Sequence, residues 1–144
     1  MADRPVRELI ERDRLVAVAP SDSTAVAVQR MAENKCGSIL VLENDRLVGI
    51  FTERDLVTRV VGIGKDPAAT VISAVMTADP DTIEAAQPAQ DAIRRMFELS
   101  YRYLPVLEDG KVIGVLSMRQ LPFGQLLDMQ WELDERRVVA ERLW

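Results

Sequence analysis

The sequence predicts an α+β fold in which two tandem β-α-β-β-α units pack through their sheets about a pseudo-two-fold axis. The first observation is an internal repeat, because the chain aligns with itself at an offset of 65 residues, without a gap from position 18 to 56. Ten pairs there are identical, where random composition gives roughly 2 or 3. A duplicated unit of this kind buries its apolar face against its twin. The residues of the first copy that are identical to the residue 65 positions later are Ala27, Arg30, Met31, Glu33, Val41, Leu42, Glu43, Gly49, Arg54 and Leu56.

The second observation is a helical periodicity that both copies share. Positions 24, 27, 28, 31 and 32 are apolar or small at the spacing of an amphipathic helix, and positions 89, 92, 93, 96 and 97 repeat them. Ser21 to Ser23 provide candidates for the first N-cap, and Pro88 suits the first turn of the second helix. We therefore expect one amphipathic helix near the start of each unit.

The third observation is a pair of β-branched runs after each helix. Runs 38–42 and 47–51 flank a polar turn, and runs 103–107 and 112–116 flank a turn containing Asp109-Gly110, a strong hairpin signal. Short strands are expected before the helices, around 17–18 and 82–83. A second helix should start near Thr52 in the first unit and near Ser117 in the second.

These elements divide the chain into a first repeat at 5–61, a linker at 62–70, a second repeat at 71–122 and a C-terminal helix at 123–144. The linker is marked by Gly62-Ile63-Gly64, which lacks the third glycine and the strand-to-helix context of a dinucleotide-binding fingerprint. The tail has an apolar stripe and a charged face. We expect it to pack across a homodimer interface, with docking on the chain's own sheet as the alternative.

Composition excludes several classes of function. The 144 residues include no histidine and one cysteine, so soft-metal sites, imidazole-based catalysis and an intrachain disulfide are not expected. The net charge of −5 and the pI near 4.8 argue against nucleic-acid binding. No apolar run approaches the ~20 residues of a membrane span, and the N-terminus lacks the apolar core of a secretory signal. A cytoplasmic location without a metal is the resulting expectation, with Cys36 as a packed, inert thiol.

The strand ends carry a family resemblance. Gly49-Ile-Phe-Thr-Glu-Arg-Asp55 and Gly114-Val-Leu-Ser-Met-Arg-Gln120 share a pattern of glycine, two apolar residues and a hydroxyl residue, followed by an acid or its amide. Leu104-Pro105-Val106 and Val75-Met76-Thr77 are further marks. The sequence thus resembles the cystathionine-β-synthase (CBS) domain family over about residues 5–122. Two tandem copies correspond to that family's Bateman module.

The motif has a physical interpretation of its own. Thr52 lies where a strand passes into a helix, so its hydroxyl can cap the helix near free N–H groups that attract an anion. Arg54 adds a planar cation, and the Asp55 carboxylate can accept hydrogen bonds from a vicinal diol. The same residues also suit a purely structural cap and a favourable first-turn acid. The resemblance favours the first interpretation, since matching residues in that family bind ribose and phosphate of adenine nucleotides.

The resemblance also implies that each cleft lies between the two copies. The Asp55 cleft would include Ile50 and receive its other wall from Met76-Thr77 and Tyr101-Arg102-Tyr103. A tyrosine there could cover a base and Arg102 could meet phosphate. Alternatively, Tyr103 is a packed strand residue and Arg102 is solvated.

The second copy departs from the pattern because Gln120 replaces the aspartate. Ser117 and Arg119 remain, and the facing wall would come from Gly37 and Ser38. Gly37 permits close backbone approach. We expect this second cleft to be the poorer nucleoside site, either empty or occupied by something different.

The function expected from the resemblance is that of a regulatory module that binds an adenine nucleotide and signals to a separate, unidentified protein. AMP is the first candidate, and ADP, ATP, NAD and S-adenosylmethionine are the others. The alternative is a structural adaptor with vestigial clefts, for which Gln120 is the best support. An enzyme is not expected, because no paired-carboxylate site groups Glu53, Asp55 and the tyrosines.

Overall fold

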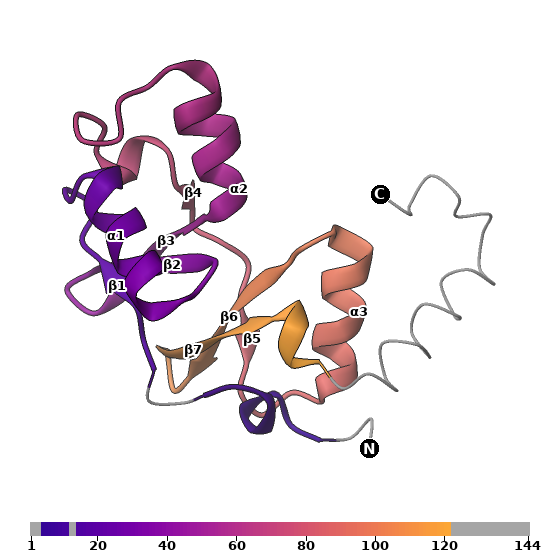
Figure 1. The fold of residues 1–144 in the computed structure, drawn as a ribbon. Helices are drawn as coiled ribbons and strands as arrows, with labels where there is room; N and C mark the ends of the chain where they lie inside the picture. Colours follow the sequence, from indigo (N-terminus) through magenta and orange to yellow (C-terminus); the bar gives the residue numbers. More distant parts are fainter. Residues whose placement is uncertain (1–3, 12–13, 122–144) are drawn as a thin grey trace, which may run out of the picture.

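The computed structural model describes residues 4–11 and 14–121. These residues form two halves, each built on one sheet with helices on its outer side (Figure 1). This confirms the predicted α+β fold of two repeated units. The first sheet has the order β1-β2-β3-β4 and the second β5-β6-β7. The strands are β1 (Ala17–Val18), β2 (Ser38–Glu43), β3 (Arg46–Thr52), β4 (Thr77–Ala78), β5 (Ile83–Glu84), β6 (Tyr103–Glu108) and β7 (Lys111–Ser117).

The two amphipathic helices form as predicted, α1 at Thr24–Asn34 and α3 at Ala89–Leu99. The Ser23 side chain caps α1 by accepting a hydrogen bond from the Val26 amide at 3.1 Å. Pro88 occupies the N-cap of α3 rather than its first turn, so that helix begins one residue later than the proline suggests. Both helices end in the left-handed conformation, at Lys35 (φ 53°) and Ser100 (φ 60°), a common way of terminating a helix.

The second helix of the first unit starts at the predicted position. α2 (Glu53–Asp55) continues into a π-helical turn, Leu56–Val60, and a 3₁₀ turn, Val61–Ile63. The segment after β7 begins with a 3₁₀ turn, Met118–Gln120. The predicted helix at 123–144 lies outside the described residues.

The hairpins β2-β3 and β6-β7 have the same register, which places the site residues. Each turns through two residues with positive φ, for example Asp109 (φ 53°) and Gly110 (φ 79°), as the turns that match strand twist require. Ser38 therefore pairs with Thr52 at the open end of the first hairpin, and Tyr103 pairs with Ser117 in the second.

Alternate residues of the central strands belong to different cores. Ile39, Val41 and Phe51 are fully buried in the cluster of the first half, which includes Ala27 of α1. Their neighbours Leu40 and Ile50 join Val112 of β7 in a separate cluster between the two sheets. Side chains alternate between the faces of a strand, so both faces of the hairpins are apolar. The two halves are consequently packed against each other.

The core of each half also contains a short segment that belongs, in the sequence, to the other predicted repeat. The 3₁₀ helix Val6–Leu9 packs with α3 in the second half, where the Val6 amide donates to the Gln87 carbonyl at 2.8 Å. Figure 1 shows this indigo segment beside the orange half. In the first half, Ile72 is fully buried in the core beside α1, and its amide donates to the Asp22 carbonyl at 2.8 Å. The halves thus exchange short segments.

This exchange predicts which half each segment stabilises. Replacing Ile72 with alanine should lower the free energy of unfolding by about 2–5 kcal/mol, because the side chain leaves a cavity. The neighbouring Val71→Ala is the control, since Val71 is 44% exposed and should cost under about 1 kcal/mol. Urea denaturation followed by circular dichroism measures both.

Native-state hydrogen exchange should locate the damage. Ile72→Ala should speed exchange in α1 more than in α3, whereas Leu9→Ala should do the reverse. Equal acceleration of both helices by both variants would contradict the exchange of segments.

Candidate functional site

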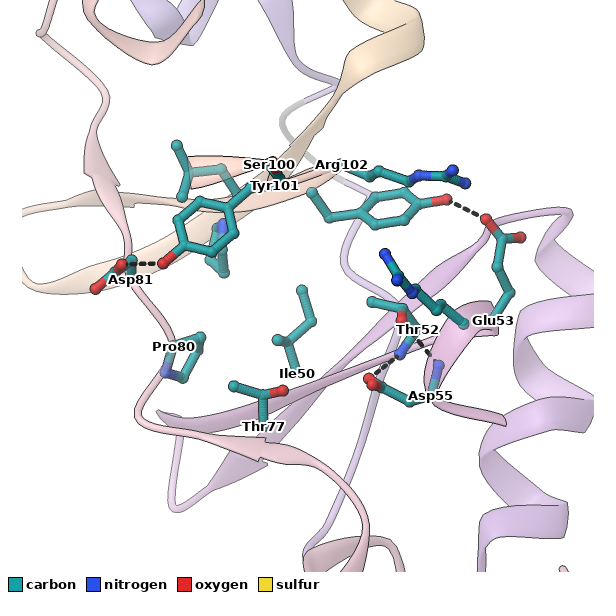
Figure 2. Close-up of a pocket in the computed structure, with 14 residues that line it drawn as sticks. Ile50, Thr52, Glu53, Asp55, Thr77, Pro80, Asp81, Ser100, Tyr101 and Arg102 are labelled. Carbon is teal, nitrogen blue, oxygen red and sulfur yellow. Dashed lines mark hydrogen bonds between the residues drawn. The ribbon is translucent and has the colours of Figure 1, made fainter. Parts of the chain in front are cut away.

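The first cleft is a cavity of about 170 Å³ between the two halves, at the end of β3 (Figure 2). Its lining comes from the β3–α2 junction on one side and from the segment leading into β6 on the other. This arrangement agrees with the placement expected between the two copies. The lining residues are Ile50, Thr52, Glu53, Arg54, Asp55, Thr77, Pro80, Asp81, Ser100, Tyr101, Arg102, Tyr103, Leu104 and Pro105.

Thr52 and Asp55 form a reciprocal cap at the start of α2. The Asp55 amide donates to the Thr52 hydroxyl at 3.2 Å, and the Thr52 amide donates to Asp55 Oδ2 at 2.9 Å. The other carboxylate oxygen, Oδ1, lies 3.6 Å from Arg59 Nε. The structural role of these residues is therefore present together with their position in the cleft. Capping uses one lone pair of Oδ2, so the carboxylate keeps acceptor capacity for a ligand.

Tyr103 and Glu53 join the two halves across the cleft. The Tyr103 hydroxyl, from β6, donates to Glu53 Oε1 of α2 at 2.8 Å. Burial and then this hydrogen bond to a carboxylate raise the pKa of Tyr103 to about 12. Gly37 makes room for the pair, because a Cβ there would lie within 2.8 Å of both Glu53 carboxylate oxygens. Tyr103 is thus both a packed strand residue and part of the cleft wall.

Tyr101 forms the wall on the opposite side. Its hydroxyl donates to Asp81, which lies on the connection before β5 (Figure 2). That hydrogen bond is the main cause of a raised pKa for Tyr101, followed by burial. Arg102 between the two tyrosines is exposed, so its guanidinium is free to reach solvent or a bound anion.

All but one of the residues predicted for this cleft line it. The exception is Met76, whose thioether occupies the space in which a side chain at Gly49 would lie. The lining also includes two kinds of residue that the sequence motifs do not predict. Glu53 occupies a variable position inside the motif, and its charge is a signal that could have placed it in the cleft. Leu104 and Pro105 belong to a family mark in β6 that by itself predicts no place in the cleft, and the remaining residues lie on connections and carry no local signal: Pro80, Asp81 and Ser100.

The second cleft is a cavity of about 240 Å³ at the end of β7. It contains all five residues predicted for it: Gly37, Ser38, Ser117, Arg119 and Gln120. Gln120 Oε1 accepts from the Ser117 amide at 2.8 Å, as Asp55 Oδ2 does from Thr52. The exchange of acid for amide therefore keeps this backbone contact and removes a charge. The remaining lining residues are Glu11, Arg14, Val16, Lys35, Cys36, Tyr103 and Val115.

Cys36 lines the second cleft and is half-buried. Burial raises the pKa of its thiol, against a smaller opposing effect of Arg14. A raised pKa lowers the thiolate fraction and hence reactivity. Within residues 4–11 and 14–121, no three Cys, Asp or Glu side chains are grouped to hold a metal ion. The same described residues include no helix with the length and hydropathy to cross a membrane.

The Tyr103–Glu53 contact makes a spectroscopic prediction. An ordinary tyrosine has a pKa of about 10, so a folded-state value of about 12 means that Tyr103 stabilises the fold fully below pH 10 and loses this effect as the pH rises through 12. The chain has two tyrosines, so Tyr101→Phe leaves Tyr103 as the sole phenol. That variant should show little tyrosinate absorbance at pH 10 while circular dichroism remains native.

Adding Glu53→Gln should lower the pKa of Tyr103 and raise the absorbance at the same pH. Half-ionisation of Tyr103 at pH 10 in the folded Tyr101→Phe protein would contradict the contact.

Comparison with known proteins identifies the family. The family described as CBS domain matches this chain twice, at residues 6–62 and 72–121. An uncharacterised protein of Methanopyrus kandleri is 32% identical over 118 residues, a match that covers 81% of this chain and 60% of that protein. The chain therefore spans less than two thirds of the length of this relative, and 25% of a CBS domain-containing protein of Arabidopsis thaliana.

Solved structures show the same fold. A crystal structure described as a CBS domain is 33% identical, has a TM-score of 0.75, and aligns over 89% of this chain and 98% of its own. A CBS domain protein from Pyrobaculum aerophilum complexed with AMP has a TM-score of 0.79 at 24% identity, with 89% of this chain and 99% of that chain covered. The two matching segments correspond to the two sequence repeats, and this chain belongs to the CBS domain family as a tandem pair of such domains.

Proposed function

We propose that this CBS pair is a regulatory module that binds an adenine nucleotide in the first cleft. The observation that carries the proposal is the position of the Asp55 carboxylate, fixed at the start of α2 in a cavity that the other half closes with Tyr101 and Arg102. AMP is the preferred ligand. ADP, ATP, NAD and S-adenosylmethionine are the alternatives.

Each part of the ligand has a counterpart in the cleft. Asp55 offers a charged acceptor to the two ribose hydroxyls, and such bonds are stronger than neutral ones. Arg54 and Arg102 provide guanidinium groups for phosphate. Ile50 and Tyr101 provide apolar and aromatic surface for the base. The lining contains three carboxylates and these two guanidiniums, a balance that favours a single phosphate over a triphosphate.

The AMP-bound protein from Pyrobaculum aerophilum supports this ligand class by similarity of fold. At 24% identity it says nothing about which residues of this chain would contact the nucleotide. The roles proposed for Asp55, Arg54 and Arg102 therefore rest on the geometry of this chain's own cleft.

A ligand in this cleft would touch both halves. It would bind more tightly to the arrangement of the halves that best encloses it, and such differential affinity shifts a conformational equilibrium. We propose that a separate protein reads this shift, that the pair does no catalysis itself, and that it acts in the cytoplasm.

A structural adaptor is the second candidate function. Its support is the reciprocal cap at the start of α2, because Thr52 and Asp55 already have a structural role there without any ligand. Gln120 fills the same task without a charge. An adaptor would show no response to any adenine nucleotide.

Asp55→Asn separates the two functions. Asparagine keeps a side-chain oxygen for the Thr52 amide but removes the charge, so the cap should persist while the ribose contact weakens. We expect the affinity for AMP to fall roughly 10- to 100-fold, the worth of a hydrogen bond to a charged group. Isothermal titration calorimetry measures the affinity, and the melting temperature without ligand checks the cap.

Gln120→Ala is the matched control at the equivalent position of the other copy, and it should leave AMP affinity unchanged. If no adenine nucleotide binds the unaltered protein at millimolar concentration, or if Asp55→Asn binds AMP normally, the nucleotide proposal fails.

We further propose that the chain forms a homodimer. An exposed apolar patch on the helical segment after β3 supports it: Val57 is 62% exposed, Val61 60% and Ile63 61%. Exposed apolar residues that gather in this way commonly mark an interface. The predicted helix at 123–144 would contribute to the same association.

Light scattering during gel filtration tests the assembly. The unaltered chain should have twice the monomer mass at tens of micromolar, and Val61→Asp should shift it toward the monomer. A monomeric unaltered chain would remove the homodimer while leaving the nucleotide proposal intact.

A further inference from the structure

The two clefts differ in charge. Among its described lining residues, the second cleft has three cations, Arg14, Lys35 and Arg119, and one carboxylate, Glu11. Glu11 lies 3.4 Å from Arg14 and offsets it in part. Among the residues that the structure describes, no carboxylate pairs with Lys35 or Arg119 within 4.0 Å. The second cleft therefore carries excess positive charge, whereas carboxylates outnumber cations in the first.

The second cleft also lacks the groups that suit a nucleoside. The amide of Gln120 replaces the carboxylate of Asp55, so no charged acceptor faces a ribose diol. At the 65-residue offset, Cys36 stands where the first cleft has Tyr101, and Gly37 stands where it has Arg102. The smaller side chains leave a roomier cavity, about 240 Å³ against 170 Å³. These differences favour a ligand that is polar and highly charged and that needs no aromatic surface for a base.

Hydrogen-bond donors complete the lining. Ser38 and Ser117 place hydroxyl groups at the ends of β2 and β7, next to the cationic rim. The hydroxyl of Tyr103, which borders both clefts, is already bound to Glu53. Glu53 lines the first cleft, but its carboxylate also lies beside Gly37, so its charge offsets one cation of the second cleft. Three cations then stand against Glu11 and Glu53, which still leaves an excess of positive charge.

We propose that the second cleft binds the di- or triphosphate group of a small anion through Lys35, Arg119 and Arg14, with no requirement for a nucleoside. Guanidinium groups match phosphate oxygens two at a time, and an ammonium group adds a compact charge. A chain of two or three phosphates carries more charge and more acceptor oxygens than one phosphate, so it can engage more of these cations at once. The group can come from free oligophosphate or from the tail of a nucleotide.

Calorimetric titration with tripolyphosphate, ATP and AMP tests this assignment. Tripolyphosphate should bind the unaltered protein, more weakly as salt is raised because the contacts are electrostatic. The double variant Lys35→Gln/Arg119→Gln should bind it about a hundredfold more weakly or worse, since each of the two lost charge-assisted bonds is worth roughly tenfold or more in affinity. Lys65→Gln/Lys111→Gln removes the same charge elsewhere and should change little.

Asp55→Asn distinguishes the two clefts and the two sources of phosphate. Tripolyphosphate should bind this variant normally, and AMP should not displace it. If ATP binds the variant as tightly as tripolyphosphate does, the nucleotide tail is a sufficient source; if only tripolyphosphate binds, the ligand is free oligophosphate.

Two results would overturn the assignment. One is the absence of tripolyphosphate binding at millimolar concentration, and the other is an equal loss in the Lys65→Gln/Lys111→Gln control. Neither depends on whether AMP binds the first cleft, so this inference and the nucleotide proposal can fail separately.

Discussion

The structure depends on the burial of the central hairpins on both faces. One set of alternating residues packs toward a helix, and the other packs against the opposite sheet, with Leu40 and Ile50 meeting Val112. A sheet that is apolar on both faces must be covered twice, so neither half is complete without the other. The clefts follow from this packing, because the ends of β3 and β7 then lie against residues of the opposite half. The apolar core therefore fixes the position of the two clefts in which the candidate ligand-binding residues lie.

Much of this arrangement can be predicted from local sequence pattern. The 65-residue repeat and its periodicities place α1, α3 and the two hairpins within one or two residues of where they form. The capping role of Thr52 and Asp55 also follows from spacing, since a hydroxyl residue and an acid three positions later satisfy each other's amides. The placement of Tyr101, Arg102 and Tyr103 in the first cleft is implied by the family resemblance, in which each cleft lies between the two copies. Because the two repeats pack about an approximate two-fold axis, residues at equivalent positions of the repeats line the two clefts.

The remainder depends on contacts that no local pattern encodes. The exchange of Val6–Leu9 and Ile72 between the halves joins residues that lie far apart in the chain. Pro80 and Asp81 line the cleft because they lie on the connection that runs from β4 in the first sheet to β5 in the second. The motif position of Met76 predicts a place in the cleft, but its side chain fills the space that Gly49 leaves open. Whether a residue faces a cavity or a neighbour is decided by packing between elements.

The exchange of segments has a consequence for any dissection of this protein. A fragment that ends at the 62–70 linker would retain Val6 and Leu9, which have no core to join, and would lack Ile72, which fills its own. The complementary fragment would have the opposite defects. Each half expressed alone would expose apolar surface and aggregate more readily, while mixing the fragments would let them complement each other. The duplicated sequence segment and the set of residues that packs into one core are therefore different stretches of the chain.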